Sequence, residues 1–133
     1  MYIDFADLDI RKGYFWIAST VTPRPVAWVS TTSADGVTNV APYSFFQCVA
    51  SDPPTLMVAP LSYADGSVKD TVRNAQETGE MTISLVSFDQ KDLMNESSMA
   101  FAPGVSEFER CGVPAAESVK VKPPRVAGAP VAF

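Results

Sequence analysis

The chain has 133 residues, of which 47% are hydrophobic and 19% charged, and its formal net charge is −5 with no histidine. This length and composition suit one folded, soluble domain spanning residues 1–133, and the negative charge without a Lys or Arg cluster disfavours nucleic acid as a partner. The apolar runs are too short to cross a bilayer and the N-terminus lacks the order of a signal peptide, so we expect a cytoplasmic protein with no membrane partner.

The N-terminal third predicts a helix followed by a β-hairpin. A short helix is expected over residues 8–19, with Leu8, Phe15 and Ile17 facing inward. The β-branched and aromatic residues at 26–32 predict a strand, and SADG (33–36) supplies a turn. Residues 37–50 then resume as a longer apolar strand, which completes the hairpin.

The remainder of the chain predicts short strands separated by short helices. SDPP at 51–54 ends the second strand, and further strands are expected at 55–60 and 81–87. Several short strands with few long helices indicate a barrel or sandwich. The segment KPPRVAGAP (122–130) is expected to cross the surface in an extended form.

Three helix starts are predicted from serines followed three residues later by an acid or amide, the pattern of a capping box. The pairs are Ser67 with Asp70, Ser87 with Gln90, and Ser106 with Glu109. Gly79 and Gly112 are expected to end two of these helices.

The segment NVAPYSFF (39–46) places Pro42 where a central strand is expected. Proline cannot donate to a sheet ladder, so we expect a bulge or a local departure from pairing there. The freed groups would suit a flat heterocycle with alternating donors and acceptors; they are the backbones of Ala41 and Tyr43 and the side chains of Asn39 and Ser44. The alternative is an edge strand with an ordinary bulge.

Two further features could bind an anion. GSVKDT (66–71) is a glycine-containing loop that enters a helix, and Ser67, Lys69 and Thr71 would add donors to the free N–H groups of the helix start. The alternative is a capped surface helix with solvated charges. The guanidinium of Arg24, held between two prolines, suits phosphate or carboxylate, and the alternative is a surface arginine paired with an acid.

No catalytic side chain is predicted. The chain has no histidine, and no carboxylate pair or activated serine stands out by its spacing. Cys48 and Cys111 lie far apart outside any CxxC pattern, so we expect two reduced, mostly buried thiols and no metal site. Any chemistry is therefore expected to come from a bound cofactor.

Six collinear segments, taken together, resemble the flavin reductase-like family of FMN-binding split barrels, which includes the flavoredoxins. They are TPRPVAWVST, DGVTNVAPYSFF, SDPPTLMVAP, VKDTVRNAQETGEM, MNESS and GVSEFERCGV, and the similarity runs from about residue 14 to the end. The resemblance implies a mainly β fold, a β-barrel with a few short helices, that binds FMN. Family members typically continue past a segment like APVAF with further strands, whereas this chain stops at Phe133, so we expect a split barrel that is incomplete at its C-terminus.

The resemblance also implies where FMN binds. Residues 24–31 and 39–45 are expected to lie along the flavin, and Lys69, Asp70 and Thr71 match the motif at its phosphate end. The expected FMN-binding residues are Arg24, Ser30, Thr31, Asn39, Ala41, Pro42, Tyr43, Ser44, Phe45, Ser67, Lys69, Asp70 and Thr71.

A homodimer with flavin pockets near the subunit interface is implied as well. Trp28, Phe45 and Phe46 are then candidates for the interface or the wall around the ring, with core packing as the alternative. The predicted function is an FMN-dependent oxidoreductase of flavin reductase or flavoredoxin type, which takes hydride or electrons from NADH, NADPH or a redox protein. The alternative is a non-catalytic flavin-binding dimer or electron carrier.

Overall fold

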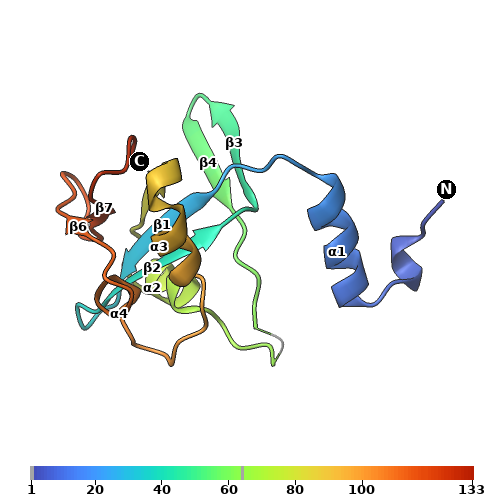
Figure 1. Ribbon diagram of the computed structural model, residues 1–133, viewed down its shortest axis with the longest axis horizontal. Helices are drawn as coiled ribbons and strands as arrows, with labels where there is room; N and C mark the ends of the chain where they lie inside the picture. The colour runs from blue at the N-terminus through green and yellow to red at the C-terminus, as the bar shows by residue number, and fades with distance from the viewer. Residues whose placement is uncertain (1, 64) are drawn as a thin grey trace.

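The strands of the protein form three separate antiparallel sheets in the residues that the computed structural model describes, 2–63 and 65–133. The main sheet has three strands in the order β2–β1–β5, formed by Thr38–Tyr43, Ala27–Thr32 and Thr82–Leu85 (Figure 1). A hairpin of β3 (Phe46–Ser51) and β4 (Pro54–Val58) follows β2. The third sheet is a short ladder of β6 (Ala115–Ala116) and β7 (Arg125–Val126).

Four helices connect or flank these strands. They are α1 (Ile10–Thr20), α2 (Asp70–Thr78), α3 (Lys91–Glu96) and α4 (Glu107–Arg110), with 3-10 turns at Phe5–Asp7 and Phe88–Gln90. All four lie where the sequence predicts a helix. Gly79 and Gly112 take left-handed backbone angles, φ 71° and 67°, directly after α2 and α4, which confirms the predicted helix ends.

The predicted capping boxes are wrong. The N-cap of α2 is Lys69, and the hydroxyl of Ser67 instead bonds to Asp65. Ser87 and Ser106 do occupy N-cap positions, but neither side chain bonds to the helix backbone. The Ser87 hydroxyl bonds to the side chain of Gln90, and the Ser106 hydroxyl bonds to that of Thr38, which is 68 positions away and is not visible in local spacing.

The β1–β2 hairpin is confirmed, and its pairing is unbroken. The turn at SADG closes with Gly36 N donating to Ser33 O (3.0 Å), and Gly36 takes the left-handed φ of 88° that this turn requires. From there the register runs without a shift to the pair of Ala27 with Tyr43, and Trp28 lies opposite Pro42. The expected bulge at Pro42 is therefore wrong.

Alternation along β2 explains why Pro42 fits a regular strand. The N–H of Val40 donates to Oε2 of Glu107 (3.1 Å), so it points away from β1. Pro42 is two residues further on and points the same way, toward the open edge of the sheet, where a ladder donor is not needed. The break in pairing comes later, at Ser44 and Phe45, and divides the expected 37–50 strand into β2 and β3.

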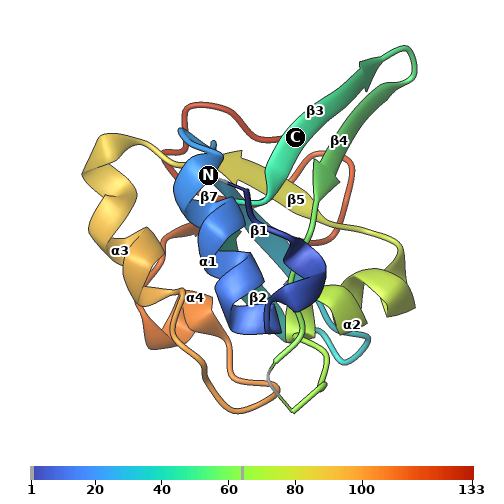
Figure 2. The ribbon, with the colours of Figure 1, turned by 90° about the vertical axis from the view of Figure 1, so that its right-hand side faces the viewer.

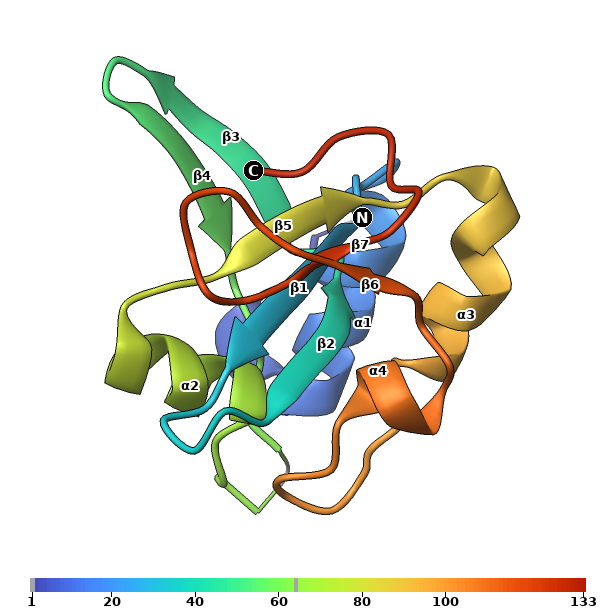
Figure 3. The same cartoon turned by 90° about the vertical axis from the view of Figure 1, so that its left-hand side faces the viewer.

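The two faces of the main sheet pack against different parts of the chain. Trp28 and Val40 contribute to a cluster with Phe108 of α4 and Val126 of β7 on one face. Ala27, Val29, Tyr43 and Ile83 form the cluster on the other face, the one nearest α2. Figure 3 shows β6 and β7 lying across the first face.

The C-terminal segment is part of the core rather than a surface crossing. Pro123 and Val126 are fully buried, and the N–H of Val126 donates to Oγ of Ser84 on β5 (3.1 Å). The expectation of an extended surface segment at 122–130 is therefore wrong. Beyond it, Phe133 exchanges two backbone hydrogen bonds with Ile83, both 2.9 Å, and extends the sheet beside β5.

Helix α1 and the β3–β4 hairpin project from this body. Figure 1 shows α1 to one side of the sheet, and Figure 2 shows β3–β4 extending beyond it. Phe15 and Ile17 remain 57% and 43% exposed, so the expectation that they face inward is wrong for this chain. Of the thiols, Cys111 is buried as expected, but Cys48 on β3 is exposed. No helix in the described part of the chain is long and apolar enough to cross a membrane.

The position of Pro42 can be tested by exchanging proline along β2. Pro42→Ala should change the free energy of unfolding by less than about 1 kcal/mol, because no ladder bond is gained or lost. Ala41→Pro should cost about 1–3 kcal/mol or more, because the alternation turns the Ala41 N–H toward Val29 of β1. Urea unfolding measures both, and equal losses would contradict the assignment.

Candidate functional site

A cavity of about 690 Å³ lies beside β2, within the size range of cofactor sites. One wall is the face of β2 that carries Asn39, Ala41 and Tyr43. The other walls are Tyr63, residues 67–71 at the start of α2, the loop at 97–103, and Glu107 of α4. Residues from three distant parts of the sequence therefore meet around one space.

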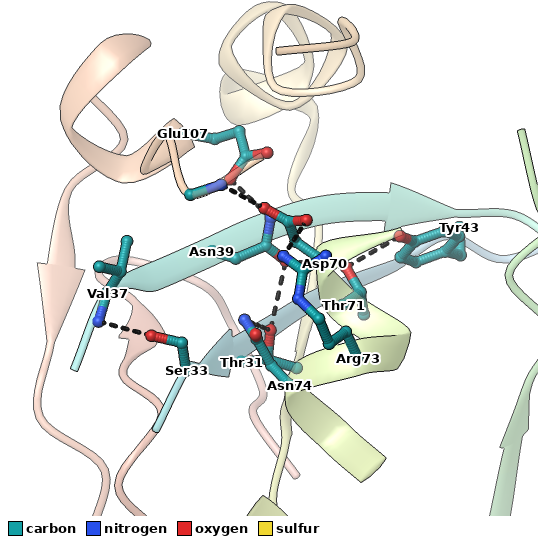
Figure 4. A network of polar contacts seen from close by, with 11 residues as sticks. Thr31, Ser33, Val37, Asn39, Tyr43, Asp70, Thr71, Arg73, Asn74 and Glu107 are labelled. Atoms are coloured by element: carbon teal, nitrogen blue, oxygen red, sulfur yellow. Dashed lines mark hydrogen bonds and ion pairs between the residues drawn. The ribbon is translucent and has the colours of Figure 1, made fainter. Parts of the chain in front are cut away.

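A buried hydrogen-bond network underlies the β2 wall (Figure 4). Oδ1 of Asn39 accepts from the hydroxyls of Thr71 (2.8 Å) and Thr31 (3.3 Å). The Thr71 hydroxyl accepts from Tyr43 OH (2.9 Å), and the Thr31 hydroxyl accepts from Nδ2 of Asn74 (3.1 Å). The directions are consistent, since each threonine hydroxyl accepts one proton and donates its own. The network fixes α2 against β1 and β2.

Glu107 holds the outer side of this network. Its side chain is only 8% exposed, and its Oε2 accepts from Nδ2 of Asn39 (2.7 Å) and from the backbone N–H of Val40 (3.1 Å). Burial raises the pKa of the Glu107 carboxyl, while hydrogen bonds from its own backbone, Val40 and Asn39 oppose the shift. A carboxylate in the cavity wall is thus tied to the edge of β2.

Tyr43 acts as a neutral donor in the same wall. Burial raises the pKa of its phenol to about 12, although the hydrogen bond to the Thr71 hydroxyl lowers it. At neutral pH the phenol therefore keeps its proton and donates it to Thr71.

The end of the cavity at α2 carries positive charge. The ammonium of Lys69 lies 5.1 Å from the ring centroid of Tyr63 and 5.7 Å from that of Tyr43. Lys69 is also the N-cap of α2, where the helix dipole favours an anion. The neighbouring Asp70 pairs with Arg73 and accepts from the N–H of Gly104 (2.8 Å), which ties the 97–103 loop to the helix start.

The structure brings together most of the residues predicted to bind the ligand. The cavity is lined by Asn39, Ala41, Tyr43, Ser67, Lys69, Asp70 and Thr71. A neighbouring hollow of about 160 Å³ shares Tyr43 and Lys69 with the cavity and is also lined by Pro42, Ser44 and Phe45. The two spaces thus meet at Tyr43 and Lys69.

The remaining predicted residues lie outside both spaces. Thr31 lies beneath Asn39 in the network, and Ser30, its neighbour on the strand, faces the opposite side of the sheet. Arg24 donates to the carbonyls of Ala18 (2.5 Å) and Val21 (2.6 Å) at the end of α1. Its Nε also donates to the Ser44 hydroxyl (3.3 Å), so Arg24 joins that helix to the segment after β2.

Two predicted phosphate donors are already engaged with protein groups. The Thr71 hydroxyl belongs to the buried network, and the Ser67 hydroxyl donates to Oδ1 of Asp65 (2.6 Å). Lys69, whose ammonium lies over two aromatic rings, is therefore the predicted cation that lines the cavity.

Several contributors to the site were not predicted from the sequence, among them Glu107, Asn74 and Tyr63. A usable signal existed for Asn74, because it lies three residues after Thr71 and so shares its face of α2. For Glu107 the capping-box pattern pointed to Glu109, which is exposed. Nothing in the local sequence indicates that Glu107 meets β2, because that contact joins residues 67 positions apart.

A family model described as "Flavin reductase like domain" matches residues 19–133. An uncharacterized protein of Aquifex aeolicus is 41% identical over 120 residues, which are 90% of this chain and 61% of that protein. The curated relatives of Deinococcus radiodurans and Bacillus subtilis are matched over 60% and 65% of their own lengths, so the chain spans less than two thirds of these relatives.

Two solved structures are similar over nearly all of the chain. Nitrilotriacetate monooxygenase component B from Bacillus cereus has a TM-score of 0.93 and 32% identity, covering 99% of this chain and 65% of that one. A putative flavin reductase with a split barrel domain from Shewanella frigidimarina has a TM-score of 0.82 and 20% identity, covering 100% and 66%. The expected split-barrel fold, mainly β with a few short helices, is thereby confirmed.

The buried network can be tested at Thr71. Thr71→Val should lower the free energy of unfolding by about 1–3 kcal/mol, because Tyr43 OH loses its acceptor and Asn39 loses a donor, all of them buried. Thr71→Ser keeps the hydroxyl and should lose less. Thr55→Val, at an exposed threonine of β4, is the control and should change stability by less than about 0.5 kcal/mol. A Thr71→Val loss as small as the control, measured by urea unfolding, would contradict the network.

Proposed function

The chain belongs to the flavin reductase-like family, and from that membership and the geometry of the cavity we propose that it binds FMN beside β2 and acts as a flavin-dependent oxidoreductase. One observation carries the proposal: a space of about 690 Å³ has a polar strand face along one wall and an ammonium at a helix N-terminus at one end. A flat ring with an anionic tail needs both features.

The residues of the cavity fit a flavin. Asn39, Ala41 and Tyr43 would lie beside the ring, on a face held rigid by the buried network. Lys69 and the first turn of α2 would bind the phosphate. Two acids also line this end of the cavity: Asp70 is paired with Arg73, and Asp65 accepts from the N–H and hydroxyl of Ser67. We assign the main phosphate role to Lys69, because Thr71 and Ser67 have their hydroxyls engaged elsewhere. A phosphate site at that end favours a phosphorylated flavin over riboflavin, and FMN is the one that we propose.

Residues of this chain would bind, orient and shield the cofactor. A bound flavin supplies hydride- and electron-transfer chemistry, so a protein proton donor is not required. NADH, NADPH or a redox protein would be the electron source. The Bacillus cereus neighbour is, by its name, one component of a monooxygenase, which favours a second protein as a partner here too. The alternative function is a flavin-binding electron carrier without turnover.

We propose a cytoplasmic homodimer, in keeping with the soluble composition. The supporting observation is the apolar surface of α1, where Phe15 is 57% and Ile17 43% exposed. Covering this surface with a second copy would remove it from water. The hollow beside Tyr14 and Phe45, where α1 approaches the sheet, would then lie close to that interface.

Absorbance of the purified protein tests the proposed function directly. We expect FMN to bind and give the visible bands of a protein-bound flavin, and NADH or NADPH to bleach those bands under anaerobic conditions. Binding without bleaching by either nucleotide would favour the carrier. A protein that stays colourless with added FMN would contradict both forms of the proposal.

The phosphate assignment can be tested at Lys69. Lys69→Met should weaken FMN binding roughly 10–100-fold, the range of one charge-assisted contact, and should weaken riboflavin binding much less because riboflavin lacks the phosphate. Lys91→Met is the matched control, since the ammonium of Lys91 also lies 5.1 Å from an aromatic ring, that of Phe88, but away from the cavity. Fluorescence titration measures all affinities, and equal losses for FMN and riboflavin would contradict the assignment.

A further inference from the structure

Glu107 is a buried carboxylate for which flavin binding alone gives no reason. It lies in the cavity wall, 8% exposed, on a four-residue helix. Burying an ionisable carboxyl is costly unless its hydrogen bonds serve a purpose, and burial does raise the pKa of this group. Its partners Asn39 and Val40 both belong to β2, so the contact acts on the wall that faces the ligand.

The hydrogen bonds of the Asn39 side chain leave one N–H group available to a ligand. Its Oδ1 already accepts from the hydroxyls of Thr31 and Thr71, which uses both lone pairs. Its Nδ2 carries two protons, of which one is donated to Glu107. What remains is a single N–H on a residue that lines the cavity.

The carboxylate of Glu107 selects this orientation. Turning the Asn39 amide over would place its oxygen against Oε2 of Glu107, so that two acceptors would face each other without a proton. The amide nitrogen would then face Thr71, whose hydroxyl proton would lose its acceptor, Oδ1 of Asn39. Glu107 therefore excludes the flipped amide.

We propose that Glu107 is a positioning residue: it locks the Asn39 carboxamide so that the β2 wall presents an N–H donor, and the ligand atom received there is a hydrogen-bond acceptor. This inference rests on the proposed flavin-binding function and makes it more specific. On an isoalloxazine ring the acceptors are the two carbonyl oxygens and the unprotonated ring nitrogens, whereas N3–H is a donor. Asn39 thus pairs with an acceptor of the flavin and not with N3–H.

The ionisable groups around Glu107 come from every element packed against it. Asp70 of α2 raises the pKa of Glu107 by charge repulsion, and Tyr43 of β2, Tyr63 and Cys111 lie close enough for Glu107 to raise their pKa values. Since the fold raises the pKa of the Glu107 carboxyl, the folded chain binds its proton more tightly than the unfolded chain does. The contribution of Glu107 to the free energy of unfolding is therefore greatest below the ordinary carboxyl pKa, and it falls as pH rises through the raised pKa of the folded chain.

Substitutions at Glu107 separate positioning from charge. Glu107→Leu removes both acceptors and should weaken FMN binding roughly tenfold or more. Glu107→Gln keeps a carbonyl oxygen for Asn39 and Val40 and should stay within about threefold of wild type. Glu109→Leu and Glu109→Gln, at an exposed carboxylate of the same helix, are the matched controls. An equal effect of Leu and Gln at position 107, or no effect of either, would overturn the proposal.

An FMN analogue methylated at N3 tests which atom Asn39 receives. Because the proposal pairs Asn39 with an acceptor, Glu107→Leu should reduce the affinity for the methylated analogue by the same factor as the affinity for FMN. A loss seen with FMN that disappears with the analogue would show that Asn39 accepts from N3–H, and would overturn the proposal.

Two measurements on the ligand-free protein keep this test independent of flavin binding. The side-chain amide signals of Asn39 in NMR spectra should shift in Glu107→Leu and stay close to wild type in Glu107→Gln. The stability of wild type relative to Glu107→Gln should decrease as pH rises through the raised pKa of Glu107. Asn39 amide signals that stay unchanged in Glu107→Leu would overturn the positioning role, whereas wild-type protein that passes the NMR test but ignores FMN would contradict only the proposed function.

Discussion

The carboxamide of Asn39 is the contact on which the cavity depends. Through it β2 is joined to β1 at Thr31, to α2 at Thr71 and to α4 at Glu107, and all four side chains are buried. Buried polar groups stabilise a fold only when every one of them is satisfied, because an unpaired donor or acceptor costs more than a formed bond returns. In this network Oδ1 of Asn74 lacks a partner, but the Asn39 carboxamide is bonded to all three neighbouring elements. These bonds hold β2, β1, α2 and α4 in one arrangement and give the cavity a firm wall.

The same contacts protect the open edge of the sheet. An edge strand normally presents unpaired N–H groups, which can pair with another chain. Along β2 the N–H of Val40 is taken by Glu107, and Pro42, the next residue to point outward, has none. Two successive donor positions are therefore closed by different means. The edge can border an open cavity without inviting another strand, which explains a proline inside a regular strand better than an interruption of pairing does.

Local patterns predicted the elements, and long-range contacts decided their roles. The hairpin at SADG, the strands after it and the glycine ends of α2 and α4 follow from turn chemistry and periodicity, and they occur where expected. The sequence patterns and the family resemblance also predicted Asn39, Tyr43 and Lys69 as site residues, and these three residues line one cavity. The side to which Pro42 points, the burial of Val126 and the role of Glu107 depend on partners far along the chain, so no local pattern reveals them. The exposed face of α1 is a further case, because its periodicity predicts an apolar face but not what covers it.

Charge gives the proposed ligand one orientation in the cavity. Glu107 bonds to Asn39 and Val40 near the start of β2, whereas the ammonium of Lys69 lies over the rings of Tyr43 and Tyr63. A phosphate dianion would be repelled by Glu107 and attracted by Lys69 and the N-terminus of α2. We therefore propose that the phosphate lies beside Lys69 and the ring along Asn39. In this orientation the Glu107 carboxylate would act on the flavin ring only through the Asn39 amide, which would offer the ring a neutral N–H donor. The negative charge itself would not contact the ring.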